Sequence, residues 1–109
     1  MKALLKIALT IVAVSVMGFS VNAGTLEDVT GRGELRCVVS TGIAGFAAPD
    51  DSGKWKGFDI DFCRATAAAV VGNADKFKAV TSTGKTRFTK LNSGEGDVLW
   101  RNTTITFSR

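Results

Sequence analysis

The stretch GFDIDFCRATAAAV, residues 57–70, has the pattern of a turn followed by the first long helix of a βα unit. Gly57 provides a flexible corner, and Asp59 is placed to accept hydrogen bonds from the first helical N–H groups. Asp61 adds a second carboxylate near the positive end of the helix dipole. Three- and four-residue spacing predicts one apolar face, made of Phe58, Phe62, Ala65, Ala69 and Val70. The stretch therefore predicts an amphipathic helix of an α/β fold.

Three predicted strands accompany this helix. Residues 35–40, LRCVVS, are rich in apolar and β-branched residues, residues 76–81 alternate between polar and apolar, and residues 97–100 form a short third run. Strand–helix–strand–helix–strand order indicates a parallel sheet flanked by helices. Ligands of such sheets bind beyond the carboxyl ends of the strands. In this chain those ends are residues 40–46, 81–84 and 101–109.

Shorter elements fill the intervals between the strands. Thr25 is the predicted N-cap of a short helix that extends to residue 29. The glycine-containing loop over residues 41–53 is expected to double back, so that residues 54–56 form a short strand. A further short helix is expected over residues 86–91.

The first 23 residues have the features of a secretory signal peptide. Two lysines precede the apolar run of residues 7–19, and Val21-Asn22-Ala23 fits a small-x-small cleavage site. We therefore interpret residues 1–23 as a cleaved signal and residues 24–109 as one small domain; an uncleaved membrane anchor is the alternative. Loss of the two signal lysines reduces the formal charge from +4 to +2. That charge is too small to indicate nucleic acid as a partner.

The two cysteines, Cys37 and Cys63, fall on the first predicted strand and on the long helix. Export to an oxidising compartment makes a disulfide the expected state of such a pair, with two buried free thiols as the alternative. The chain has no histidine, and two cysteines alone are too few for a zinc site. We therefore expect a disulfide and neither a metal nor another cofactor.

Catalytic and phosphate-binding patterns are weak. Without histidine the usual general base is missing. The carboxylate pairs Asp50–Asp51 and Asp59–Asp61 fit turn and helix-start roles, although a paired-carboxylate hydrolase stays open. Residues 82–86, STGKT, are similar to the end of a phosphate-binding loop, but Ala79 occupies the position of its first glycine. A capped strand-to-helix loop is the better interpretation.

The most informative polar segment is RNTTITFSR, residues 101–109, which follows the third predicted strand. It offers hydroxyl groups, free backbone amides and two guanidinium groups. Arginine binds a carboxylate bidentately, and threonine adds a neutral hydrogen bond. The segment therefore indicates an anion-binding loop, with a plain polar loop as the alternative.

Several motifs in order resemble one family. GFDIDFCRATAAAV is similar to the signature of the family 3 extracellular solute-binding proteins, the amino-acid receptors of ABC importers. The wider resemblance, nearest to the general L-amino-acid-binding branch, covers essentially all of residues 24–109 and includes GTL at 24–26, LRC at 35–37, GFAAPD at 45–50, RFT at 87–89 and RNTT at 101–104. The resemblance implies part of the first lobe of a type II periplasmic-binding-protein fold, with the second lobe absent.

The resemblance also assigns site residues. Arg109 matches the arginine that pairs with the ligand α-carboxylate, and Thr104 matches its hydroxyl and amide partner. Asn102 corresponds to the position whose backbone carbonyl holds the α-ammonium. Phe46 lies near the aromatic residue that packs over the ligand. Two further residues are expected at the cleft, where they affect side-chain choice: Ser40 and Arg101.

The resemblance therefore implies a periplasmic, monomeric substrate-binding component of an amino-acid ABC transporter, which delivers L-amino acids to membrane permease subunits and catalyses no reaction. Two alternatives are a periplasmic enzyme of the same fold, of dehydratase or lyase type, and a small exported interaction module. Family members are much longer, so we expect this chain to end inside the first lobe. Half a cleft leaves ion pairs exposed, where each contributes about 0–1 kcal/mol, so weak or no ligand binding is expected.

Overall fold

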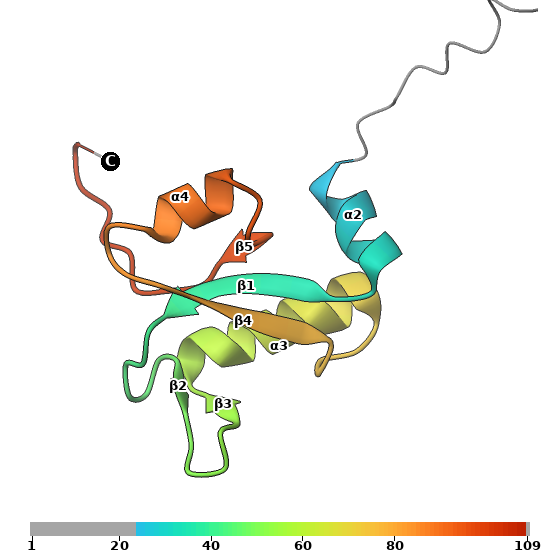
Figure 1. The fold of residues 1–109 in the computed structure, drawn as a ribbon, viewed down its shortest axis with the longest axis horizontal. Coiled ribbons are helices and arrows are strands. Elements are labelled where there is room, and N and C mark those ends of the chain that lie inside the picture. Colours follow the sequence, from blue (N-terminus) through green and yellow to red (C-terminus); the bar gives the residue numbers. More distant parts are fainter. Residues whose placement is uncertain (1–23, 109) are drawn as a thin grey trace, which may run out of the picture.

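The computed structural model of the protein describes residues 24–108 (Figure 1). The predicted signal peptide and Arg109 lie outside the described residues. In chain order the elements are α2 (Thr25–Arg32), β1 (Leu35–Ser40), β2 (Ala48–Pro49), β3 (Trp55–Lys56), α3 (Phe58–Val71), β4 (Phe77–Ser82), α4 (Arg87–Asn92) and β5 (Val98–Leu99).

A parallel sheet with the order β4-β1-β5 forms the centre of the fold. β1 and β4 pair in register from Leu35 and Phe77 to Ser40 and Ser82. The strand β1 is buried along almost its whole length because it lies between two neighbours. This arrangement confirms the predicted α/β fold with a parallel sheet. The predicted doubling back is also confirmed, since β2 and β3 pair as a small antiparallel hairpin.

Most of the core residues belong to the strand β1 and the helix α3. Alternate residues of β1 point to opposite faces of the sheet, so that Cys37 and Val39 pack with α3. The helix α4 contacts β1 and β5 on the other side (Figure 1). The main core consists of Val29, Leu35, Cys37, Val39, Ala47, Ile60, Cys63 and Ala67.

The predicted apolar face of α3 is wrong. The helix buries Ile60, Cys63 and Ala67, whereas the side chains of Phe58 and Phe62 are 60% and 41% exposed. Small and medium side chains let the helix axis approach β1 closely, and the larger aromatic rings are left to stack on one another. The remaining residues of the predicted face are exposed or half-buried: Ala65, Ala69 and Val70.

The start of α3 also differs from the prediction. Gly57, not Asp59, is the N-cap, and no side chain caps the helix. Instead, the backbone N–H groups of Phe58 and Asp59 donate to the carbonyls of Gly45 and Phe46 at 2.9 Å each. Gly57 has a φ of +121°, and a Cβ there would lie 2.3 Å from the Phe46 oxygen. The preceding loop therefore replaces the cap, and only glycine fits the corner.

A similar correction applies to α2, since its N-cap is Gly24 rather than Thr25. Thr25 is the first helical residue. Gly33 ends the helix in the left-handed conformation typical of a C-cap. Over the described part of the chain, no helix is long and apolar enough to cross a membrane.

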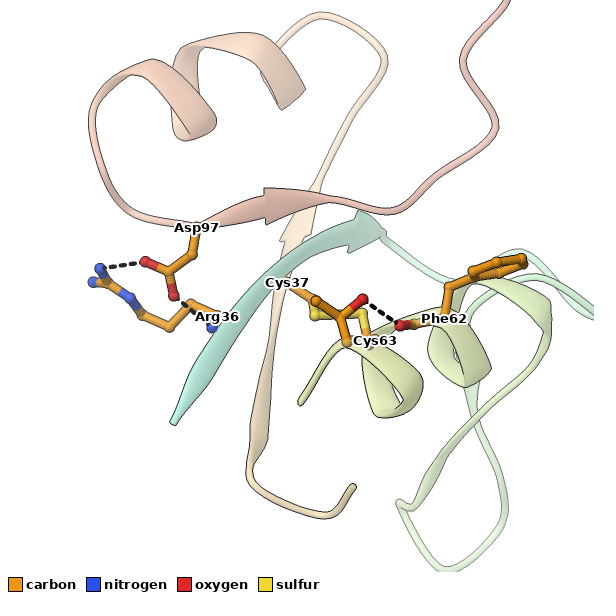
Figure 2. The surroundings of a disulfide bond; sticks show 6 residues. Arg36, Cys37, Phe62, Cys63 and Asp97 are labelled. Carbon is orange, nitrogen blue, oxygen red and sulfur yellow. Dashed lines mark hydrogen bonds and ion pairs between the residues drawn. A yellow bond between two sulfur atoms is a disulfide. The ribbon is translucent and has the colours of Figure 1, made fainter. Parts of the chain in front are cut away.

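The disulfide between Cys37 and Cys63 is present, as predicted, and joins β1 to α3 across a Cα–Cα distance of 6.2 Å (Figure 2). Both cysteines are fully buried. Next to the bridge, the Thr66 hydroxyl donates to the Phe62 carbonyl one helical turn earlier, at 2.8 Å. The bridge therefore fixes α3 on the centre of the sheet.

A second fixed point lies at the amino end of the sheet. The Asp97 carboxylate accepts hydrogen bonds from the guanidinium groups of Arg32 and Arg36. It also accepts one from the backbone N–H of Arg36, at 2.7 Å (Figure 2). The Asp97 side chain is only 4% exposed. One carboxylate thus ties α2, β1 and the entrance of β5 together.

Candidate functional site

The carboxyl ends of the three parallel strands meet at one edge of the sheet, on the side where the hairpin and the last residues of the chain lie (Figure 1). Ser40 ends β1 and is paired in register with Ser82, which ends β4. Both residues are buried. The Ser40 hydroxyl donates to the Ala47 carbonyl at 3.2 Å, and the Ser82 hydroxyl donates to the Val39 carbonyl at 2.9 Å. These bonds fix the floor of the edge.

Arg101 connects the third strand end to this floor. It follows β5, and its Nη1 donates to the Ser82 carbonyl at 2.7 Å and to the Ser82 Oγ at 3.3 Å. Burial lowers the pKa of the Arg101 guanidinium; the neighbouring Arg87 lowers it further, and Asp59 raises it. A half-buried cation is therefore held in one place by backbone and hydroxyl oxygens.

Arg87, the first residue of α4, is a second cation at this edge. Arg87 is only 6% exposed, and its Nη1 donates to the backbone carbonyl of Asn102 at 3.5 Å. The side-chain oxygen of the same Asn102 accepts from Arg101 Nε, also at 3.5 Å. The two guanidinium groups therefore meet at Asn102. Within residues 24–108, neither of them forms an ion pair.

Asp59 is the acidic residue that acts on this cluster. It is 6% exposed, and its Oδ2 has no hydrogen-bond partner in the described part of the chain. Burial raises the pKa of the Asp59 carboxyl, while the charge of Arg101 opposes that rise. With two guanidinium groups against one carboxylate, the cluster formed by Arg87, Arg101 and Asp59 has an excess of positive charge.

A row of aromatic rings flanks the cluster. Phe46 and Phe58 meet edge to face with ring centroids 6.5 Å apart, and Phe58 and Phe62 do so at 4.9 Å. Phe62 in turn stacks on Trp100 at 4.9 Å. Trp100 directly precedes Arg101, so this row extends from the loop after β1 to the end of β5. It offers an apolar surface beside the charged one.

The structure places the predicted site residues in four different ways. Arg101 and Asn102 are brought together at the strand ends. Phe46 and Thr104 are exposed, and Arg109 lies outside the described residues. Ser40 lies at the same edge but is fully buried, and its hydroxyl already donates a hydrogen bond to the Ala47 carbonyl.

The sequence interpretation gives three residues of this edge no individual role at the site: Ser82, Arg87 and Asp59. The sequence places Ser82 in a capped loop at a predicted strand end, Arg87 in a family motif and Asp59 at a helix start. The available signal was position, because Ser82 follows the predicted second strand and Arg87 opens the helix after it. No group of three or more potential metal-ligating side chains occurs among residues 24–108.

Comparisons with known proteins agree with this architecture. Residues 35–109 match the bacterial extracellular solute-binding proteins, family 3. The chain is 50% identical over 106 residues to the general L-amino acid-binding periplasmic protein AapJ of Rhizobium johnstonii, an alignment that covers 97% of this chain and 31% of AapJ. The chain therefore spans about a third of the length of that relative.

Two solved structures are also similar. An ABC transporter periplasmic binding protein from Brucella ovis with glutathione bound has 55% sequence identity and a TM-score of 0.76, over 81% of this chain and 27% of that one. A mutant of the arginine-bound form of domain 1 from TmArgBP of T. maritima has 27% identity and a TM-score of 0.66, over 77% of this chain and 63% of that one. The second structure is a single domain with a similar fold.

Proposed function

This chain belongs to the bacterial extracellular solute-binding proteins, family 3, and we propose that it is the first-lobe portion of the substrate-binding component of an amino-acid ABC transporter. In this proposal it captures L-amino acids for membrane permease subunits and catalyses no reaction. Residues 1–23 are a signal peptide that is removed on export to the periplasm. Residues 24–109 then belong to the amino-terminal lobe, and the protein is monomeric.

The observation that supports this function best is the convergence of Ser82, Arg101 and Asn102 at the carboxyl edge of a parallel sheet. Sheets of this kind bind ligands outside the carboxyl ends of their strands. The names of the relatives point in the same direction, since AapJ is described as L-amino acid-binding and periplasmic, and the Brucella ovis protein as part of an ABC transporter.

The proposed contacts divide between the two ends of the ligand. Arg109 and Thr104 bind the α-carboxylate, and the Asn102 carbonyl accepts from the α-ammonium group. Phe46 packs against the aliphatic part of the ligand. Arg101 faces the side chain of the ligand. Ser40 affects the choice of side chain indirectly, because its hydroxyl holds the loop at Ala47.

The expected affinity is low. With one lobe the ligand stays open to water, and exposed ion pairs contribute about 0–1 kcal/mol each. The TmArgBP structure is described as an arginine-bound form of domain 1, which supports some binding by a first lobe alone. We therefore propose millimolar rather than micromolar binding for this chain.

The test is an NMR titration of the purified full chain with L-alanine, with D-alanine as the ligand control. We expect shifts of the amide signals of residues 102–104 that saturate in the millimolar range with L-alanine only. Thr104→Val removes a hydroxyl donor to a charged group and should weaken binding about fivefold.

The matched variant Thr30→Val removes a hydroxyl on α2, where Thr30 bonds to its own helix, and should bind like the wild type. Failure of L-alanine to shift any of these signals would overturn the proposed millimolar binding by this chain. Micromolar binding would contradict the proposed low affinity.

A further inference from the structure

The disulfide between Cys37 and Cys63 is enclosed by the core. Both cysteines are 0% exposed. Within the sheet, Cys37 is aligned with Ala79 of β4 on one side and with Val98 of β5 on the other. The helix α3 packs on the same face of β1 (Figure 2). Three strands and a helix therefore surround the bridge.

The helix side of the bridge is apolar. Ile60 and Ala67 lie about one turn before and after Cys63 and are also 0% exposed. Arg36, the residue before the first cysteine, donates from its guanidinium group to Asp97 at 3.0 Å and is thus held at the amino end of the sheet. A reduced cysteine among apolar side chains gives little thiolate, and the thiolate is the form that exchanges with a disulfide.

Formation of the bridge is an oxidation and needs a second disulfide, written here as RSSR. The thiolate of one cysteine attacks RSSR, which gives a mixed disulfide on that cysteine and releases one RS⁻. The thiolate of the other cysteine then attacks the cysteine sulfur of the mixed disulfide, closes the bridge and releases the second RS⁻. Two protein thiols thus give up two electrons and two protons, and RSSR becomes two thiols. The mixed disulfide carries an extra group, for which a close-packed site at 0% exposure has no room.

We propose that the Cys37–Cys63 bridge forms by exchange with an external disulfide before α3 packs on β1, and that packing then closes the bridge to further exchange. The order of the elements along the chain permits this. Residues 37–63 contain, besides the two segments that carry the cysteines, only the loop after β1 and the hairpin of β2 and β3. The bridge can therefore close before β4 and β5 join the sheet.

A chain that packs α3 while both thiols are still reduced is trapped in the reduced state. Its thiols meet an oxidant only when the helix opens from the sheet. The chain must therefore reach the compartment that holds the disulfide oxidant before its core has packed. This order follows from the burial of the two cysteines and does not depend on ligand binding.

The first test starts from the purified full chain with the bridge formed and follows its reduction by dithiothreitol. The thiols that appear are alkylated and counted by mass spectrometry. In native buffer we expect reduction to be about 100-fold slower than in concentrated urea, because the bridge is reached only through rare opening. Ile60→Ala removes buried contacts between α3 and β1, so it should speed reduction in native buffer about tenfold and leave the rate in urea unchanged.

The matched control is Leu26→Ala, which removes the same number of carbon atoms from a residue of α2 that is 57% exposed. Its bridge should be reduced in native buffer within about twofold of the wild-type rate, and circular dichroism checks that both variants fold. Equal rates of wild-type reduction in native buffer and in urea would overturn the proposal. So would equal native rates for Ile60→Ala and the wild type.

The second test follows the reverse reaction. The full chain is reduced and unfolded in urea and then diluted into native buffer, with cystamine, a small disulfide, present from the start or added after a delay. If circular dichroism shows that the reduced chain packs during the delay, we expect the bridge to form about tenfold more slowly after it. A reduced chain that does not reach the native spectrum also supports the order, since packing then requires the bridge. Equally fast bridge formation in a packed, reduced chain would disprove it.

Discussion

The two ends of the central sheet use the same residue types in opposite ways. At the amino end, Asp97 lies between two guanidinium groups and also accepts from a backbone N–H. At the carboxyl end, Arg87 and Arg101 share Asn102, and Asp59 Oδ2 has no partner in the part of the chain that the structure describes. We call the amino end the closed end, because the charges there are paired with one another. We call the carboxyl end the open end, because polar groups there have no partner among the described residues.

The difference separates stability from recognition. A carboxylate with several donors joins α2 to β1 and β5 and leaves no capacity for a ligand. Uncompensated groups at the other edge are unfavourable in the free protein, and perturbed or unpaired charges of this kind gather at functional sites. Substitutions at the closed end should therefore change stability, and substitutions at the open end should change ligand preference.

The largest effect is expected from the disulfide, which lies between the two ends. The bridge closes a loop over a sequence separation of 26 residues, for which chain entropy gives about 3–4 kcal/mol of stability. The double variant Cys37→Ala, Cys63→Ala should lose about that amount in urea denaturation. Adding a reductant should destabilise the wild type and leave the double variant unchanged. An unchanged wild-type transition after reduction would contradict the prediction.

A smaller loss is expected at the closed end. Asp97→Ala removes both ion pairs and the acceptor of the Arg36 N–H. The two arginines are 30% exposed and can be hydrated, so we expect about 2–3 kcal/mol, below the usual range for a fully buried pair. Urea denaturation measures it, with the exposed Asp51→Ala as the control, for which a change within about 0.5 kcal/mol is expected. Equal losses in the two variants would show that the closed end is not a stabilising contact.

Much of the fold was predictable because its main signals are local. The strand LRCVVS at residues 35–40 and the positions of the two cysteines on that strand and on the long helix each depend on a few neighbouring residues. The orientation of α3 was not predictable in this way. The spacing predicts a face that contains Phe58 and Phe62. The burial of Ile60 and Cys63 instead depends on the disulfide and on close approach to β1.

The site was predictable only in part, for a related reason. Arg101 and Asn102 stand next to one another in a polar segment, so their joint position could be inferred. Arg87 enters the same site from another element through a contact with Asn102 across 15 positions of sequence. Asp59 had a local explanation as a helix cap, which concealed its effect on Arg101. Residues with an adequate local role give no sequence signal for a distant one.

The smallest effect on stability is expected at the open end, from Asp59→Asn. Burial raises the folded pKa of Asp59 above its ordinary value of 3.8, so the folded state holds this proton more tightly than the unfolded state does. The stability that the protonated form contributes is therefore complete at pH values below 3.8 and is lost as the pH rises through the folded pKa. The variant never ionises at this position, so it does not suffer that loss.

We therefore expect Asp59→Asn to be slightly more stable than the wild type at pH 7, by about 1 kcal/mol or less. The difference should disappear at pH 3, where the wild-type side chain is also neutral. Thermal unfolding at the two pH values measures it, with Asp61→Asn as the control, because Asp61 is exposed on the same helix turn. A variant that is less stable at pH 7 would mean that the attraction between Asp59 and Arg101 outweighs burial. The charged groups at both ends of the sheet would then stabilise the folded state, and the carboxyl end would no longer differ from the amino end in this respect.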